Sequence, residues 1–297
     1  MRIVVVGASG LVGRHIVAVL HERGHQATTV ARTPGPDVDH ALDATKDTPP
    51  LEGHDGVVFA AGVDDRNIPR KPAYPTFHAG NVEPVARLLG AARDHGLTRA
   101  VVLGSYYTHF HRTHPEWRLA ALHPYIRSRV EQARAAREAA GADLPVAVLE
   151  LPFVFGRAGD RLPNWAEPLE KWVTSRSPLV APPGGSAATT ARRVAEVAVR
   201  ALEDRSGEDI PVGDENLTWR EMFGRIADAT GHPRRVRSLP AGVVKAALRL
   251  TGVVHALQGK ESGLDPAHLP DLLLRELFLG EGTPGAIEGA LGETFTR

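Results

Sequence analysis

The start of the chain carries the stretch that decides the fold, Ile3-Val4-Val5-Val6-Gly7-Ala8-Ser9-Gly10-Leu11-Val12-Gly13. The β-branched run that precedes Gly7 predicts a strand buried on both faces, as in a parallel sheet. Apolar residues then follow at helical spacing as far as Arg23, and Gly24 is placed to end that helix. The stretch therefore predicts a strand and a helix joined by a glycine-rich turn.

Each glycine of this turn has its own structural task. Gly7 makes the tight turn out of the strand, Gly10 lets the backbone approach a pyrophosphate, and Gly13 lets the helix pack closely on the sheet. The start of the helix offers free N–H groups and a partial positive charge to phosphates. We therefore predict a dinucleotide site, and not a turn that only permits close packing. The expected contacts are Gly7, Ser9, Gly10, Leu11, Val12, Gly13 and Arg14.

Beyond this turn, short apolar runs alternate with amphipathic stretches as far as about residue 151. Further strands are predicted at residues 26–31, 41–42, 56–61, 99–103 and 145–151, and helices at residues 77–95 and 119–140. Such alternation is typical of βαβ units. We therefore predict an α/β fold with a doubly wound parallel sheet of the Rossmann type.

The pattern changes after about residue 152, where proline and glycine become frequent. We predict a Rossmann domain over residues 1–157, to which later segments can return, and a mainly helical substrate-binding lobe over residues 158–297. The helices expected in this lobe cover residues 217–229, 241–257 and 269–279. Ligands of open α/β sheets bind at the carboxyl ends of the strands, so the lobe is expected to close over that site. The alternative is a helical cap that only completes the core.

The composition excludes several functional classes. The 297 residues have a formal net charge of zero and include no cysteine. Disulfides, thiolate metal sites and a cysteine nucleophile are therefore excluded, and the loop histidines at 109, 111 and 114 lack a metal-site spacing, so no metal is expected. Balanced charge gives no reason to expect a nucleic acid or a membrane surface as partner. With no apolar run long enough to span a bilayer and no signal-peptide pattern, we expect a soluble cytoplasmic protein.

The end of the second predicted strand bears on which cofactor is bound. Enzymes that prefer NAD usually present Asp or Glu there to bind the ribose hydroxyls. This chain has Val30-Ala31-Arg32-Thr33, a guanidinium in place of a carboxylate. Arg32 can pair with a 2′-phosphate, and Arg14 can add a second positive charge. We predict NADP(H) in preference to NAD(H), with a solvated strand end as the alternative role of Arg32.

The two-and-two spacing of Gly7, Gly10 and Gly13 resembles that of the extended short-chain dehydrogenase/reductase superfamily, often called the NAD-dependent epimerase/dehydratase family. The resemblance is strong over residues 1–157 and looser beyond. It implies further cofactor contacts from small residues, from an acidic residue near the adenine, from an asparagine, and from the segment after the sixth strand. The positions that match are Ala60, Ala61, Asp43, Asn81, Pro152 and Val154. For Asp43, a role as a turn or cap residue is an equal alternative.

The catalytic residues that the resemblance implies are Ser105, Tyr125 and Arg129. Tyr125-Ile126-Arg127-Ser128-Arg129 resembles the family's Tyr-x-x-x-Lys motif, and its spacing places both ends on one helix face. Ser105 would orient the substrate oxygen and Tyr125 would exchange a proton with it. Arg129 would hold the nicotinamide ribose and favour the phenolate. Arginine keeps the charge of the usual lysine but cannot release a proton, so a non-catalytic site is the alternative.

The sequence gives weaker signals for substrate recognition than for cofactor binding. Candidate contacts are the aromatic residues near the expected cleft, Tyr106, Tyr107, Phe155 and Trp165. Nucleotide-sugar members of the family clamp a diphosphate with an arginine that this chain lacks. Arg192 and Arg193 replace the acidic pair that follows it, and we expect them to be solvated or ion-paired at a helix start.

Together these features predict an NADP(H)-dependent oxidoreductase that interconverts a carbonyl and an alcohol on a small organic substrate. One alternative is a nucleotide-sugar epimerase or dehydratase. Another, from a different class, is a non-catalytic dinucleotide-binding sensor or assembly factor. The sequence leaves open the substrate, the direction of the reaction and the oligomeric state, a homodimer included.

Overall fold

The computed structural model describes residues 1–295, which form two compact units. The first unit contains Met1–Leu151, Arg192–Val212 and Lys260–Leu264. The second unit contains the intervening segments and those that follow Leu264. The boundary lies after Leu151 instead of residue 157, and two later segments return to the first unit.

The first unit is built on a seven-stranded sheet, in the order β10-β6-β5-β4-β1-β2-β3. All of its strand pairs are parallel. The strands are β1 (Arg2–Val6), β2 (Gln26–Ala31), β3 (His40–Ala41), β4 (Gly56–Phe59), β5 (Arg99–Leu103), β6 (Val146–Glu150) and β10 (Asp209–Pro211). Strand order reverses beside β1, so the predicted doubly wound Rossmann-like fold is confirmed.

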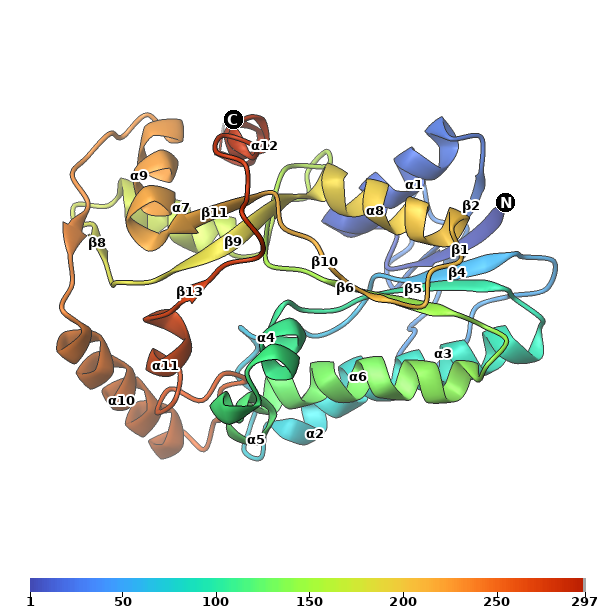
Figure 1. Cartoon of the computed structure of the whole chain (residues 1–297), viewed down its shortest axis with the longest axis horizontal. Helices are drawn as coiled ribbons and strands as arrows, with labels where there is room; N and C mark the ends of the chain where they lie inside the picture. The colour runs from blue at the N-terminus through green and yellow to red at the C-terminus, as the bar shows by residue number, and fades with distance from the viewer. Residues whose placement is uncertain (296–297) are drawn as a thin grey trace. The chain divides into compact units, whose positions relative to one another are not determined.

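Helices cover both faces of this sheet. Figure 1 shows α1 (Leu11–Glu22) and α8 (Ala191–Glu203) on one face, and α3 (Glu83–Asp94) and α6 (Pro124–Ala140) on the other. Shorter helices are α2 (Tyr74–Phe77), α4 (Tyr107–Thr113) and α5 (Leu119–Leu122), with a π turn at His78–Val82 and a 3-10 turn at Pro115–Trp117. The strands contribute fully buried side chains such as Val4, Val57 and Val102, which pack against Leu89 and Ala136 of the helices. This apolar layer is the main source of stability of the unit.

Two predicted helices are interrupted. The helix expected over residues 77–95 consists of α2, the π turn and α3. The helix expected over residues 119–140 breaks at His123, which has φ −128° and ψ 111°. The cause is Pro124, because a proline ring disfavours helical geometry in the residue before it. α6 therefore starts at Pro124 and carries Tyr125 in its first turn.

The second unit mixes strands and helices. Its four-stranded sheet contains β7 (Phe153–Phe155), β9 (Gly185–Thr190), β11 (Glu215–Thr218) and β13 (Glu276–Leu277). β8 (Val180–Ala181) pairs with β12 (Arg237–Ser238). The helices are α7 (Ala166–Thr174), α9 (Trp219–Ala229), α10 (Ala241–Leu257), α11 (Pro270–Leu273) and α12 (Glu288–Phe295).

The prediction of a mainly helical lobe missed this sheet. Its strands are short, and β9 consists of Gly, Ser, Ala and Thr, a mixture with little strand signal. The helix expected at residues 217–229 starts at Trp219, where Thr218 and Glu221 form a capping box. The helix expected over residues 269–279 ends at Leu273, and β13 follows. None of the helices within residues 1–295 is long and apolar enough to cross a membrane.

Candidate active site

The glycine turn after β1 is shaped by close backbone contacts. Gly7 has φ +89°, and a Cβ atom there would lie 2.6 Å from the carbonyl oxygen of Ala60. A Cβ atom at Gly13 would lie 2.2 Å from the carbonyl oxygen of Gly7. The backbone N–H of Gly7 donates to the Val30 carbonyl at 2.8 Å. The turn thus packs directly on the ends of β2 and β4, where only glycine fits.

The N-terminus of α1 has the properties of an anion site. Among the described residues, no side chain caps it, and its first turn holds no acidic residue. The cap residue Gly10 is exposed, and Ser9, Leu11 and Val12 are half-buried beside it. The first backbone N–H groups of a helix lack partners within the helix and attract phosphate. The turn and helix start therefore fit the pyrophosphate of a dinucleotide.

Arg32 is exposed directly after β2. Nearby, the carboxylate of Asp43 accepts hydrogen bonds from the Thr45 hydroxyl at 2.8 Å and the Thr45 N–H at 3.1 Å. These bonds hold the pKa of Asp43 below its usual value, with smaller contributions from the charges of Lys46 and Arg32. Asp43 thus closes a turn, which is its alternative role, and its charge lies near Arg32. Ala60 and Ala61 are half-buried at the end of β4, and Arg14 is half-buried on α1.

The structure brings Ser105, Tyr125 and Arg129 together. All three are buried, with 4%, 6% and 9% of their surface exposed. The Nε of Arg129 donates to the Tyr125 hydroxyl at 3.2 Å, and the hydroxyl of Ser105 is close enough to lower the pKa of Tyr125. The backbone N–H of Tyr125 donates to the Gly263 carbonyl at 2.9 Å. Tyr125 is therefore held from two directions, one of them by a segment that returns late in the chain.

The guanidinium of Arg129 is fixed by further contacts. Its Nη1 donates to Gln132 Oε1 at 2.9 Å and approaches the Leu103 carbonyl at 3.5 Å. Its two terminal nitrogens lie 3.4 and 3.5 Å from where a Cβ of Gly62 would be. A guanidinium has five N–H donors. The bonds to Tyr125, Gln132 and Leu103 leave donors that a ribose hydroxyl can use.

Asn81 holds the loop that follows β4 in place through hydrogen bonds. It is fully buried in the π turn. Its amide oxygen accepts from the Val63 N–H at 2.8 Å, and its amide nitrogen donates to the Val63 carbonyl and to Ser128 Oγ, both at 3.1 Å. Asn81 thus ties the connection after β4 to α6. In this structure its amide bonds to the Val63 backbone and to the Ser128 hydroxyl, so any effect on a cofactor would act through that loop.

Asp65, on the same loop, is a site residue that sequence reasoning missed. It is half-buried. Burial and the neighbouring charge of Asp64 raise its pKa, against a smaller opposing effect of Arg66 and Arg129. The feature of the sequence that could have identified Asp65 is its position in the loop after a predicted strand, because loops at the carboxyl ends of parallel strands line ligand sites.

The protonation of Tyr125 follows from its surroundings. Burial is the largest influence and raises its pKa. The charge of Arg129 opposes the rise and that of Asp65 adds to it. Tyr107 lies edge-on to Tyr125 with ring centroids 6.3 Å apart, and burial together with Tyr106 raises the pKa of Tyr107. Both tyrosines are therefore neutral phenols at neutral pH.

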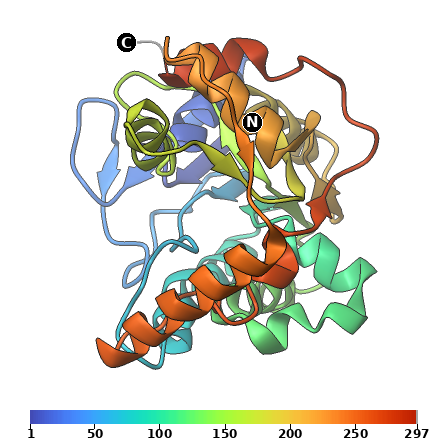
Figure 2. The same cartoon turned by 90° about the vertical axis from the view of Figure 1, so that its left-hand side faces the viewer.

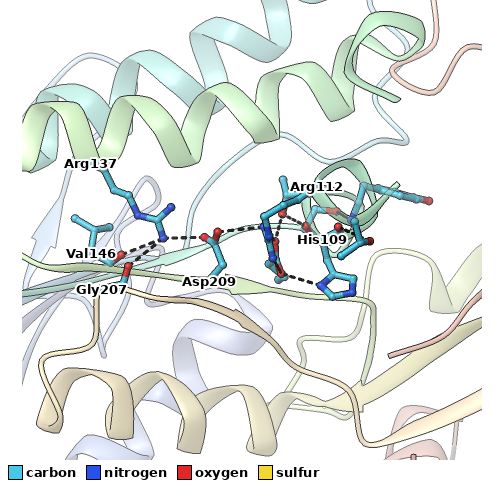
Figure 3. Close-up of polar contacts among 11 residues, drawn as sticks. His109, Arg112, Arg137, Val146, Gly207 and Asp209 are labelled. Carbon is cyan, nitrogen blue, oxygen red and sulfur yellow. Dashed lines mark hydrogen bonds and ion pairs between the residues drawn. The ribbon is translucent and has the colours of Figure 1, made fainter. Parts of the chain in front are cut away.

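An ionic network around the buried Glu150 anchors the segment that carries Ser105, and Figure 3 shows Arg112 and Asp209 of this network. Glu150, at the end of β6, is fully buried and accepts from Arg112 Nη1 and Nη2 at 2.9 and 3.0 Å. Thr108 Oγ1 lies 2.7 Å from Glu150 Oε1 and 2.7 Å from the Ser105 carbonyl oxygen. Arg112 also pairs with Asp209 of β10 at 3.1 Å. The buried carboxylate of Glu150 is therefore neutralised by an arginine from α4.

His109 lies beside the same network. Its Nδ1 is 3.6 Å from Glu150 Oε2. Burial lowers the pKa of His109, against an opposing effect of Glu150. Across residues 1–295, no three His, Asp or Glu side chains are grouped to hold a metal ion.

The remaining residues that were predicted to contact cofactor or substrate are divided between the two units. Pro152, Val154, Phe155 and Trp165 belong to the second unit. Phe155 is fully buried and packs edge-on against Trp165, with centroids 4.8 Å apart. Phe155 therefore packs in the core of that unit, and its side chain is not exposed in this structure. Tyr106 is only 4% exposed and packs on Phe110 and Tyr107.

Comparison with known proteins gives a family match. The model of the NAD dependent epimerase/dehydratase family matches residues 3–172. No curated protein matches the sequence.

Several solved structures share the fold. The crystal structure of gox2253 has a TM-score of 0.72 and 20% identity, covering 98% of this chain and 92% of that chain. Human epimerase family protein SDR39U1 (isoform 2), solved with NADPH, has a TM-score of 0.68 and 18% identity, covering 99% of each chain. UDP-N-acetylglucosamine 4-epimerase from Bacillus cereus has a TM-score of 0.66 and 16% identity, covering 99% and 95%. At these identities the likeness shows the fold alone.

Proposed function

The chain belongs to the NAD-dependent epimerase/dehydratase family, and from that premise we propose that it is an NADP(H)-dependent oxidoreductase that interconverts a carbonyl and an alcohol on a small organic substrate. The observation that carries this proposal is the buried group of Ser105, Tyr125 and Arg129, in which Arg129 donates a hydrogen bond to the Tyr125 hydroxyl. A buried phenol held between a hydroxyl and a cation is suited to exchanging a proton with a substrate oxygen.

The glycine turn supports the cofactor part of the proposal. Gly7 and Gly13 leave room that a side chain would fill, and the uncapped start of α1 suits a pyrophosphate. Arg32 supplies a cation for a 2′-phosphate, and a structural neighbour, human SDR39U1, was solved with NADPH. The remaining donors of Arg129 would hold the nicotinamide ribose. When bound, the nicotinamide supplies or accepts the hydride.

Tyr125 would act as the acid in carbonyl reduction. Reduction needs a hydride at carbon and a proton at oxygen, and Tyr125 starts as a neutral phenol that can donate this proton. Ser105 would hydrogen-bond the same oxygen and hold it in place. Arg129 would stabilise the phenolate that forms, which then regains a proton from solvent. Because burial raises the pKa of Tyr125, the neutral phenol that carbonyl reduction needs is present at neutral pH, whereas alcohol oxidation would need its phenolate.

The test is NADPH oxidation by the full chain with a panel of aldehydes, ketones and quinones. We expect turnover with some carbonyl in the wild type, and its loss in Tyr125→Phe with NADPH affinity kept. Binding of NADPH without turnover across the panel would overturn the reductase and favour a sensor or assembly factor. Equal turnover in Tyr125→Phe would overturn the role of Tyr125.

A nucleotide-sugar epimerase or dehydratase is the second candidate, favoured by the fold shared with the Bacillus cereus epimerase. Against it, Arg192 is not available to clamp a diphosphate, because it pairs with Glu22 at 2.6 Å and with Glu196 at 2.8 Å. This pairing agrees with the ion-paired helix start expected from the sequence. Incubation with UDP-sugars, followed by chromatography of the products, distinguishes the two candidates.

A further inference from the structure

A short return segment, Lys260–Leu264, belongs to the first unit, although the chain on either side of it belongs to the second unit. In the chain it follows α10, the long orange-red helix of Figure 2. Ser262, Gly263 and Leu264 are buried in the first unit, and Glu261 is half-buried. The contacts of this segment lie around Tyr125, the residue to which we assign the proton transfer.

Gly263 supplies a hydrogen bond that the start of α6 otherwise lacks. The first N–H groups of a helix have no partner within the helix, and among residues 1–295 no side chain caps the start of α6. The helix begins at Pro124, which has no N–H. The next N–H is that of Tyr125, and it donates to the Gly263 carbonyl at 2.9 Å. The return segment therefore fixes the backbone of Tyr125 directly.

A side chain at residue 263 would push the return segment away from Tyr125. A Cβ atom on Gly263 would lie 2.5 Å from Cζ of Phe77 and 3.0 Å from Cβ of Tyr125. Carbon atoms that are not bonded pack best at about 3.5 to 4.0 Å. Phe77 itself packs edge-on against Tyr125, with ring centroids 5.8 Å apart. Glycine at this position lets the segment lie against both residues at once.

Glu261 holds the short helix that carries Phe77. Its Oε2 accepts a hydrogen bond from the Ala73 N–H at 2.6 Å, and its own N–H donates to the Pro69 carbonyl at 3.0 Å. Ala73 is fully buried and directly precedes α2, which ends at Phe77. A carboxylate is a strong acceptor for an N–H at a helix start. Glu261 thus fixes α2, and α2 places Phe77 against Tyr125.

We propose that Gly263 and Glu261 are positioning residues for Tyr125, an inference that rests on the proposed function of Tyr125 as the acid. Gly263 acts on the backbone of Tyr125, and Glu261 acts through Phe77. In the described part of the chain, no hydrogen bond joins either residue to the Tyr125 hydroxyl. Their effect is therefore on where the phenol lies, and an error of about 1 Å in such a position can cost about 100-fold in rate.

Hydrogen exchange of the Tyr125 N–H tests the contact without any need for turnover. Gly263 is the acceptor of this N–H, so its protection reports on the return segment. The chain has four tyrosines, and labelling the full chain with ¹⁵N-tyrosine gives one amide signal for each. Tyr125→Phe identifies the signal of Tyr125. We expect exchange about 10-fold faster or more in Gly263→Ala and in Glu261→Ala than in the wild type.

Turnover tests whether the contact matters for the reaction. Gly263→Ala should lower kcat for carbonyl reduction about 10- to 100-fold, because the new methyl group displaces Phe77 or Tyr125. NADPH affinity should stay within about 2-fold. Gly56→Ala is the matched control, since its Cβ would lie 2.3 Å from Cγ of Arg99 at the opposite end of β4. It brings a similar clash but should keep the wild-type kcat.

Two further variants separate positioning from a general loss of stability. Glu261→Gln keeps an oxygen that can accept from the Ala73 N–H, so it should keep most of the kcat that Glu261→Ala loses. Gly263→Ala combined with Phe77→Leu removes the ring atoms closest to the new methyl group. This double variant should regain part of the lost kcat. If Gly263→Ala alone does not fold, the two Glu261 variants decide.

Several results would overturn the proposal. One is a wild-type kcat in Gly263→Ala together with faster exchange of the Tyr125 N–H. Another is an equal loss of kcat in Gly56→Ala, and a third is an equal loss in Glu261→Gln and Glu261→Ala. A wild type that reduces no carbonyl would overturn the proposed function instead. In that case unchanged exchange in both variants would also show that the return segment does not hold Tyr125.

Discussion

The Nε of Arg129 donates a hydrogen bond to the Tyr125 hydroxyl at 3.2 Å, one turn further along α6. The cation in this pair cannot give up a proton, because a guanidinium stays charged throughout the accessible pH range. Arg129 therefore stabilises a phenolate on Tyr125 without passing a proton to it. In the proposed reaction, Tyr125 would therefore exchange its proton with the substrate and with solvent, and not with Arg129.

Replacing Arg129 by methionine should impair the proposed reaction. Arg129 is the strongest influence that lowers the pKa of Tyr125. Without it the phenolate loses its stabilising charge, so we expect kcat for carbonyl reduction to fall about 100-fold or more. In alcohol oxidation, the ionisation assigned to Tyr125 should move to higher pH. Arg134→Met, at an exposed position of the same helix paired with Glu138, is the control. An unchanged kcat would remove Arg129 from the mechanism.

Asp65→Asn should lower the pKa of Tyr125, which is the opposite of the effect expected for Arg129→Met. The charge of Asp65 raises the pKa of that tyrosine, so its removal should move the ionisation seen in alcohol oxidation to lower pH. Asp64→Asn is the matched control, since Asp64 is paired with Arg66 at 2.6 Å. The pH profile of kcat measures the effect, and a shift to higher pH in Asp65→Asn would contradict it.

Arg32→Ala should weaken the binding of NADPH much more than the binding of NADH. A charge-assisted bond to a 2′-phosphate contributes roughly 1.5 to 3 kcal/mol. We therefore expect NADPH affinity to fall about 10- to 100-fold, and NADH affinity to stay within about 2-fold. Fluorescence titration of the reduced cofactors measures both, and Arg134→Ala controls for the loss of a surface charge. Equal losses for the two cofactors would refute the preference for NADP(H).

Gly13→Ala tests the close packing under the glycine turn. The added methyl group would lie 2.2 Å from a backbone oxygen, so the helix must shift and its first turn with it. We expect a loss of about 1 to 3 kcal/mol in stability and a marked loss of NADPH affinity. Gly90→Ala, in the middle of α3 with no atom within 4 Å of the new Cβ, should stabilise by about 0.5 to 1 kcal/mol. Urea denaturation compares the two variants, and a loss of stability in Gly90→Ala as large as that in Gly13→Ala would show that the close contact at Gly13 is not the cause.

The sequence by itself determined the features that depend on neighbours along the chain. The run Ile3–Val6, the glycines of the turn and the helix after them predicted the first βαβ unit, and the parallel sheet followed from their repetition. The four-residue spacing of Tyr125 and Arg129 predicted that both lie on one helix face. Patterns of this kind are readable because strand and helix periods are set by local backbone geometry.

Only the tertiary structure decided which distant residues meet. Asp65 acts on Tyr125, 60 positions later, because the loop after β4 and the segments after β5 both follow the carboxyl ends of neighbouring parallel strands. Glu150 forms an ion pair with Arg112, and the Tyr125 backbone N–H donates to the Gly263 carbonyl. No local sequence pattern encodes either pairing. A buried carboxylate or backbone donor must find a partner, but the partner's identity depends on how the chain is wound. For that reason the strands and the pairing of Tyr125 with Arg129 on one helix were predictable, whereas the other charges that act on the pKa of Tyr125 were not.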